Sequence, residues 1–182
     1  MILNLPNKLT LFRIFIIPVF LLFLLGGAGG EYSRYIALAI FIIASVTDAL
    51  DGYIARKTNR VTNFGKFMDP LADKVLVCSA LIALIQTGDI SSVVVIVIIA
   101  REFIITGFRL VASDNGVVIA ASNWGKLKTI SQMIMVMYLI LGLHAKGGLF
   151  ETLALVLIAA AVFFTAVSAV DYIVKNVGVL KA

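Results

Sequence analysis

Residues 151–173 read ETLALVLIAAAVFFTAVSAVDYI, with charged side chains only near the two ends of the run. A membrane-spanning helix needs about 20 mostly apolar residues, so this run is long enough to cross a bilayer. Similar apolar runs recur along the chain. We expect six spans, at about 9–25, 34–56, 69–87, 90–110, 126–143 and 151–173. Because backbone polar groups in hydrocarbon are satisfied within helices, the sequence predicts an all-α, polytopic membrane protein with six transmembrane helices.

Composition supports the same class. Of 182 residues, 62% are hydrophobic and 14% charged, against roughly 45–50% and 25% in a soluble domain. Six spans leave only short tails and loops, so we expect a single membrane domain over residues 1–182. The single cysteine, Cys78, excludes an intramolecular disulfide framework and a cysteine-based metal cluster. The net charge of +5 would suggest nucleic acid for a soluble protein, but here we expect no nucleic-acid partner.

The basic residues predict the orientation, because cytoplasmic loops of membrane proteins are rich in Lys and Arg. Only Arg34 and Lys146 fall near loops other than those at 57–68 and 111–125. The remaining basic residues are Lys8, Arg13, Arg56, Lys57, Arg60, Lys66, Lys74, Arg101, Arg109, Lys126, Lys128, Lys175 and Lys181. We therefore expect both termini and the loops at 57–68 and 111–125 in the cytoplasm. The short lead at residues 4–8 is expected to lie along the membrane surface as an interfacial segment.

Four aspartates stand close together in sequence and at helical spacing. Asp48 and Asp51 are three residues apart at the end of the second span, and Asp69 and Asp73 are four apart at the start of the third. The two spans are expected to be antiparallel neighbours, so the two pairs can meet. Four carboxylates near a bilayer need compensating positive charge. Because the ligands are all oxygen, we expect Mg²⁺ or Mn²⁺, with two ions per site.

Simpler readings of the same residues exist. Asp69 before Pro70 is also typical of a helix N-cap followed by proline in the first turn. Asp73 beside Lys74 could form an ordinary interfacial ion pair. Gly52, Ala55 and Gly65 would let a ligand approach the backbone closely, or would only permit close packing of helices.

As one string, Asp48-x2-Asp51-Gly52-x2-Ala55-Arg56-x8-Gly65-x3-Asp69-x3-Asp73 resembles the signature of the CDP-alcohol phosphotransferases at all eight positions. The resemblance implies six transmembrane helices, commonly a homodimer, and a two-metal site. It also implies transfer of a phosphatidyl or phosphoalcohol group from a CDP-linked donor with release of CMP. For this chain it assigns Asp48, Asp51 and Asp69 to metal binding, and Asp73 to the second metal and to general-base catalysis. By the same resemblance, the residues contacting the CDP moiety of CDP-diacylglycerol are Gly52, Ala55, Arg56, Thr62 and Gly65, with Asn7 and Thr10 as weaker candidates.

Other stretches resemble the bacterial branch of that family that uses glycerol 3-phosphate as the acceptor. They are Pro6-Asn7-Lys8-Leu9-Thr10-Leu11-x-Arg13, Arg101-Glu102-Phe103 with Gly107-x-Arg109, and Ala120-Ala121-Ser122-x-x-Gly125-Lys126-x-Lys128-Thr129. This resemblance implies a role in phospholipid biosynthesis at the cytoplasmic membrane of a bacterium.

The phosphate of glycerol 3-phosphate needs cations beside the metal site. Arg101, Arg109 and Lys126 are the candidates, because basic side chains, and Arg forks above all, suit phosphate oxygens. The tendency of cytoplasmic loops to be basic would place such residues here in any case. Glu102 is placed to orient Arg101.

Two alternatives to this function stay open. The same metal site would serve another acceptor: inositol phosphate, serine or phosphatidylglycerol. A divalent-cation transporter would also need intramembrane carboxylates, but it leaves Gly52, Ala55 and Arg56 unexplained.

Overall fold

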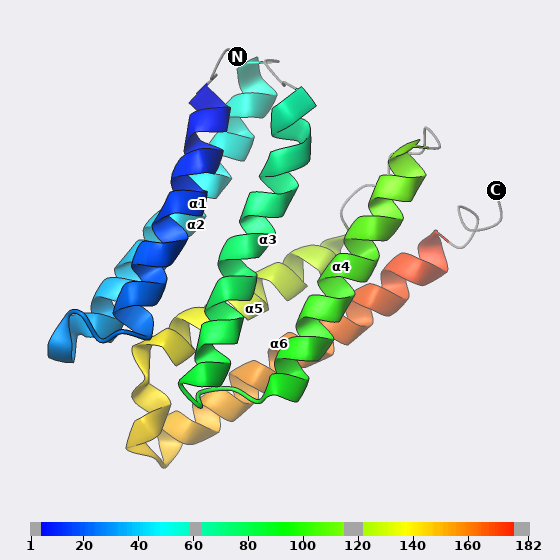
Figure 1. The fold of residues 1–182 in the computed structure, drawn as a ribbon. Helices are drawn as coiled ribbons and strands as arrows, with labels where there is room; N and C mark the ends of the chain where they lie inside the picture. Colours follow the sequence, from blue (N-terminus) through cyan, green and yellow to red (C-terminus); the bar gives the residue numbers. More distant parts are fainter. Residues whose placement is uncertain (1–4, 59–62, 115–121, 177–182) are drawn as a thin grey trace. The chain divides into compact units, whose positions relative to one another are not determined.

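The computed structural model describes residues 5–58, 63–114 and 122–176, with side chains for residue 12 and residues 14–47, 74–112 and 122–176. Six α-helices run through these ranges (Figure 1), and two short 3-10 helices, η1 (Gly30–Tyr32) and η2 (Leu143–Lys146), lie in the connections. The α-helices are α1 (Leu5–Leu24), α2 (Ser33–Thr58), α3 (Asn63–Gln86), α4 (Ser92–Asp114), α5 (Asn123–Leu141) and α6 (Leu149–Lys175). The described ranges contain no strand, which confirms the predicted all-α class.

Helices extend beyond the apolar runs from which they were predicted. Because α2 ends at Thr58 and α3 begins at Asn63, the predicted loop over 57–68 is wrong. Likewise, α1 begins at Leu5, so residues 5–8 continue the first helix and do not form a separate lead. Hydropathy marks where side chains suit hydrocarbon, whereas the helix continues through polar residues that still favour it. Pro6 does not oppose this start, because proline is tolerated in the first turn.

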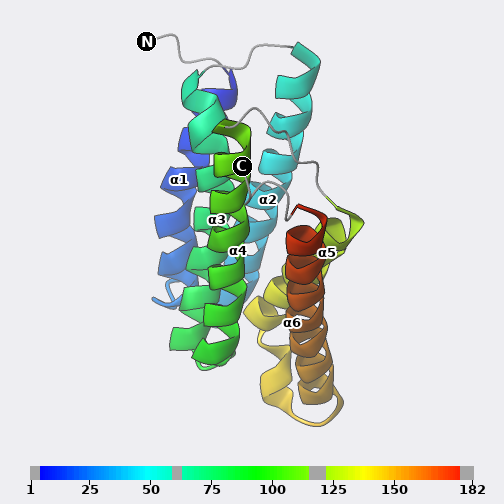
Figure 2. The same cartoon turned by 90° about the vertical axis from the view of Figure 1, so that its right-hand side faces the viewer.

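The described residues pack as two compact units, the first within residues 1–89 and 140–142. In this unit α1 packs against both α2 and α3, and Figures 1 and 2 show the three helices side by side. The rings of Phe20 on α1 and Phe41 on α2 are fully buried, with their centroids 5.9 Å apart. The end of α2, the start of α3 and the start of α1 lie at the same end of the unit.

At the other end of the first unit, the polar side chains of Arg34, Thr87 and Asp89 join α2 to the segment that follows α3. Arg34, near the start of α2, forms an ion pair at 3.0 Å with Asp89, which follows α3. Thr87 Oγ1 also donates to Asp89, at 2.6 Å. Gly142 lies against Arg34 with a φ of 67°, and a Cβ added there would stand 2.5 Å from Arg34 Nη1. Glycine therefore fits this position for two reasons, its backbone conformation and the space that Arg34 occupies.

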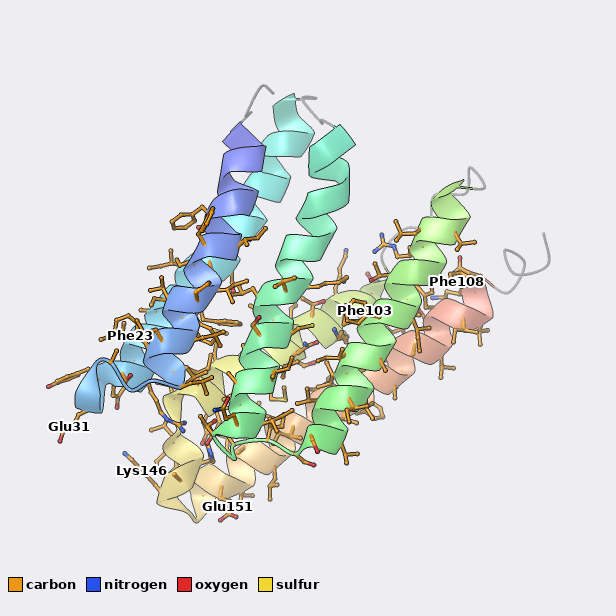
Figure 3. All side chains as sticks on the ribbon, in the orientation of Figure 1. Phe23, Glu31, Phe103, Phe108, Lys146 and Glu151 are labelled. Carbon is orange, nitrogen blue, oxygen red and sulfur yellow. The ribbon has the colours of Figure 1, made fainter. Side chains whose placement is uncertain are left out.

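The second unit contains α4, α5 and α6, within residues 90–139 and 143–182. The rings of Phe108 on α4 and Tyr172 on α6 meet edge to face at 5.7 Å. Trp124 on α5 and Phe164 on α6 lie 6.4 Å apart. Phe103, labelled on α4 in Figure 3, has a side chain that is 55% exposed. α6 thus packs against both α4 and α5 within this unit.

Among the described residues, α6 is the one helix long and apolar enough to cross a membrane by length and composition. Shorter apolar segments lie at Ile14–Leu24 in α1 and Lys74–Gln86 in α3. Large apolar side chains are also more than half exposed on α4, namely those of Val93, Ile96, Phe103, Ile104, Leu110 and Val111. Such a surface suits a lipid or protein environment better than water.

Candidate functional site

The four aspartates of the predicted metal site lie on two consecutive helices. Asp48 and Asp51 are in the second half of α2, and Asp69 and Asp73 are in the first half of α3. The second half of α2 and the first half of α3 lie toward the same end of the first unit (Figures 1 and 2). The four side chains lie outside the described ones.

The reading of Asp69 as a helix N-cap is wrong. α3 begins at Asn63, so Asp69 and Pro70 lie inside the helix. Within a helix, proline removes one backbone hydrogen bond and costs about 3 kcal/mol. An N-cap role for Asp69 therefore does not explain why Asp69 is followed by Pro70 within this helix.

The predicted CDP-binding residues come from three helices that share one end of the first unit. Asn7 and Thr10 belong to the first turns of α1, Gly52, Ala55 and Arg56 to the end of α2, and Gly65 to the start of α3. Their side chains lie outside the described ones, and Thr62 lies outside the described residues altogether.

A separate polar network lies among the described side chains of the second unit, and Arg101 on α4 is its centre. Its Nη2 donates to the hydroxyl of Ser168 on α6 at 3.0 Å. Its Nη1 lies 3.4 Å from Oε1 of Glu102, the residue expected from the sequence to orient Arg101. The Nε atom is buried and has no hydrogen-bond partner among the described residues. A buried donor without a partner costs about 1–3 kcal/mol, and such groups in proteins call for a specific explanation.

Lys128 on α5 extends the network to a third helix. Its Nζ pairs with Glu102 Oε1, the same oxygen that faces Arg101. The Lys128 side chain is only 5% exposed and that of Glu102 16%. The three side chains carry two positive charges and one negative charge, and Arg101 and Lys128 both face the carboxylate of Glu102.

The other two predicted acceptor-binding residues are more open to solvent. Arg109 is exposed two turns further along α4, and Lys126 is exposed at the start of α5. Both Arg101 and Arg109 interact electrostatically with Tyr172 on α6. The structure thus associates Arg109 with the surroundings of Arg101, and the contacts described for the network do not include Lys126.

Sequence reasoning missed Lys128 and Ser168. The sequence carries a signal for Lys128. Lys128, Gln132, Met135, Val136 and Leu139 stand at helical spacing and form the buried face of α5. For Ser168 the signal was a polar stripe, because Thr165, Ser168 and Tyr172 fall on one buried face of the apolar α6. Neither pattern names the partner, since that depends on how the helices pack.

Comparison with known proteins gives the class. Residues 3–170 match the CDP-alcohol phosphatidyltransferase family. The chain is 49% identical to a CDP-diacylglycerol–glycerol-3-phosphate 3-phosphatidyltransferase of Bacillus subtilis, over 98% of this chain and 97% of that protein. It therefore belongs to the CDP-alcohol phosphatidyltransferase family.

Further relatives carry related names. A probable phosphatidylglycerophosphate synthase of Mycobacterium tuberculosis is 44% identical, over 94% of this chain and 81% of that protein. A CDP-diacylglycerol–glycerol-3-phosphate 3-phosphatidyltransferase of Rickettsia typhi is 38% identical, over 93% of this chain and 94% of that protein. The similarity thus extends across most of each chain, including the second unit with the Arg101 network.

Proposed function

We propose that this protein transfers the phosphatidyl group of CDP-diacylglycerol to glycerol 3-phosphate, giving phosphatidylglycerophosphate and CMP in phospholipid biosynthesis. The observation that carries the proposal is the near full-length identity of 38–49% to relatives named for this reaction. Arg101 adds support, because a guanidinium suits the phosphate dianion that is the acceptor of this reaction.

The donor chemistry of the four aspartates fits a hard divalent cation, because every ligand they offer is a carboxylate oxygen. We propose that Asp48, Asp51, Asp69 and Asp73 hold two Mg²⁺ or Mn²⁺ ions. When bound, such ions stabilise the charge that develops on the transferred phosphoryl group and on the leaving CMP.

Asp73 has a second role in this proposal, as the general base. Its carboxylate takes the proton of an acceptor hydroxyl as the oxygen of that hydroxyl bonds to the phosphorus of the phosphatidyl group. The bond from this phosphorus to the CMP oxygen breaks, and CMP leaves with the electron pair. Arg56, Gly52, Ala55, Thr62, Gly65, Asn7 and Thr10 are proposed to bind the CDP moiety of the donor.

Arg101, Arg109 and Lys126 are proposed to bind the phosphate of glycerol 3-phosphate. Arg101 is the best supported of the three, because two contacts fix its guanidinium while its buried Nε retains an unused N–H. A phosphate oxygen accepting from that N–H would satisfy a donor that the described residues leave without a partner.

We propose further that all six helices span the cytoplasmic membrane of a bacterium as one domain over residues 1–182, with both termini and the active site on the cytoplasmic side. Basic residues support the orientation, because they gather near the termini and in two connections. A homodimer is proposed from family resemblance.

An acceptor panel tests the proposed function. One detergent-solubilised preparation is given CDP-diacylglycerol, Mg²⁺ and, in separate reactions, glycerol 3-phosphate, inositol phosphate, serine or phosphatidylglycerol, and CMP release is measured. The proposal expects rapid release only with glycerol 3-phosphate. Faster release with another acceptor would replace the proposed substrate, and ion flux without CMP release would indicate a transporter.

A further inference from the structure

Ser168 on α6 is fully buried, and its hydroxyl takes part in two hydrogen bonds. It donates to the backbone carbonyl of Thr165 at 2.9 Å, one turn earlier in the same helix. It accepts from Arg101 Nη2 at 3.0 Å. Because a serine hydroxyl has a single proton, the bond to Thr165 leaves its lone pairs aimed at the guanidinium. The local helix geometry therefore orients Ser168 as an acceptor for Arg101.

Two anchors determine the plane of the Arg101 guanidinium. Ser168 accepts from Nη2, and Glu102 lies 3.4 Å from Nη1. An arginine side chain has several rotatable bonds, whereas the guanidinium itself is rigid and planar. Holding both Nη atoms consequently also fixes the direction of the Nε–H bond, which is the donor that remains without a partner.

The anchors come from different helices. Glu102 follows Arg101 on α4 and is itself paired with Lys128 of α5. Ser168 lies on α6, a helix in which polar side chains are costly unless they have partners. The buried face of α6 is formed by Ala154, Ala161, Thr165, Ser168 and Tyr172. Because Ser168 contacts Arg101 of α4, α6 contributes to the position of a proposed acceptor-binding residue as well as to packing.

We propose that Ser168 is a positioning residue for acceptor binding: through its hydrogen bond it holds Arg101 so that Nε faces the phosphate of the acceptor. This inference rests on the proposed function, and on the assignment of Arg101 to the acceptor in particular. Ser168 does not touch the acceptor itself. Its loss therefore weakens acceptor binding by freeing Arg101 to adopt other orientations, at a cost in pre-organisation.

The test compares Ser168→Ala with Ser168→Thr, which keeps the hydroxyl. We expect Ser168→Ala to raise the KM for glycerol 3-phosphate about tenfold, as for loss of one hydrogen bond to a charged group. The KM for CDP-diacylglycerol should change less than about twofold, and Ser168→Thr should restore most of the acceptor affinity. Equal changes in both KM values, or no rescue by threonine, would overturn the proposal.

Thr165→Val is the matched control. Thr165 is as buried as Ser168 and lies one turn away, but its hydroxyl donates to Ala161 of its own helix at 2.6 Å. Its loss should leave both KM values within about twofold of the wild type. If Thr165→Val raises the KM for glycerol 3-phosphate as much as Ser168→Ala does, the effect belongs to α6 packing and the proposal fails.

A double-mutant cycle separates this inference from the function on which it rests. If Ser168 acts through Arg101, Ser168→Ala has no further effect on the acceptor KM once Arg101→Ala is present. If the effects of Ser168→Ala and Arg101→Ala on the acceptor KM are additive, the positioning role of Ser168 is overturned while the assignment of Arg101 stands. If Arg101→Ala leaves the acceptor KM unchanged, the assignment of Arg101 under the proposed function is wrong, and the inference about Ser168 falls with it.

Thermal unfolding of each variant in detergent accompanies the kinetics. Ser168→Ala should melt within a few degrees of the wild type, because alanine suits a helix and the site is small. Should Ser168→Ala prove too unstable to assay, Ser168→Cys takes its place. Cysteine keeps the size of serine but is a weak acceptor, so the same rise in the acceptor KM is expected, and its absence would overturn the proposal.

Discussion

Lys128 of α5 and Glu102 of α4 form an ion pair in which the lysine side chain is only 5% exposed. A buried ammonium is costly without a compensating carboxylate, so this pair ties the two helices together. Glu102 at the same time faces Arg101, the residue assigned to the acceptor phosphate. Packing of the second unit and the proposed acceptor chemistry therefore depend on one carboxylate.

Glu102→Gln should destabilise the protein by about 3 kcal/mol, because it removes one charge of a buried ion pair with Lys128. Lys175→Met, which breaks the pair of Lys175 with Asp171, is the control. The Lys175 side chain is 63% exposed, so the expected loss there is below about 1 kcal/mol. Unfolding in detergent by heat or denaturant measures both. Similar losses for the two variants would contradict the assignment of Lys128 and Glu102 as a buried pair.

Gly142→Ala should destabilise the first unit by more than the about 1 kcal/mol expected for alanine at a positive φ. The added Cβ would displace Arg34 from its ion pair with Asp89. Gly147→Ala is the control, because Gly147 has a φ of 74° but no atom within 4 Å of an added Cβ. The melting temperature of each variant gives the comparison. A loss for Gly147→Ala as large as that for Gly142→Ala would show that Arg34 has no part in the effect.

Chelation of divalent cations should abolish CMP release, and Mg²⁺ or Mn²⁺ should restore it. The reason is that four carboxylates at one site repel each other and cannot bind a pyrophosphate without compensating cations. The measurement is activity after dialysis against a chelator and after addition of each metal. Full activity in the chelated protein would contradict the two-metal proposal.

Asp73→Asn should lower kcat by at least about a hundredfold, because an amide cannot accept the proton of the acceptor hydroxyl. Asp171→Asn is the matched control, an aspartate on α6 that pairs with the exposed Lys175. Steady-state kinetics with both substrates measure the two variants. A variant at position 73 that keeps near wild-type kcat would exclude Asp73 as the general base.

Arg101→Ala, Arg109→Ala and Lys126→Ala should each raise the KM for glycerol 3-phosphate. The largest rise, about tenfold or more, is expected for Arg101, because a charged hydrogen bond in a buried setting is worth more than one at the surface. Arg109 and Lys126 are exposed, so smaller effects that shrink with added salt are expected. An unchanged KM in both Arg109→Ala and Lys126→Ala would remove these two residues from the acceptor site.

The helix order was predictable from the sequence, because each apolar run of about 20 residues must satisfy its backbone internally. The start of α3 was not, since Asn63, Gly65 and Lys66 interrupt the apolar residues of 63–68, while the helix nevertheless includes them. Hydropathy reports the solvent that a side chain prefers and does not report where hydrogen bonding begins.

The aspartate site and the Arg101 network also differ in how far the sequence predicts them. The aspartates could be named from spacing alone, because residues three and four apart on a helix share a face. Ser168 could not, because its partner Arg101 lies 67 positions away and meets it only through the packing of α6 on α4. The sequence motif alone favours Lys126 as an acceptor ligand, whereas the apolar residues of α5 place Lys128 on the buried face.

The most direct test of the central claim follows both products of one reaction. Purified protein is incubated with CDP-diacylglycerol, radiolabelled glycerol 3-phosphate and Mg²⁺, and labelled lipid and free CMP are quantified together. The account predicts labelled phosphatidylglycerophosphate and CMP in equal amounts, with both products lost in Asp73→Asn. CMP released without label in the lipid, or labelled lipid formed undiminished by Asp73→Asn, would contradict it.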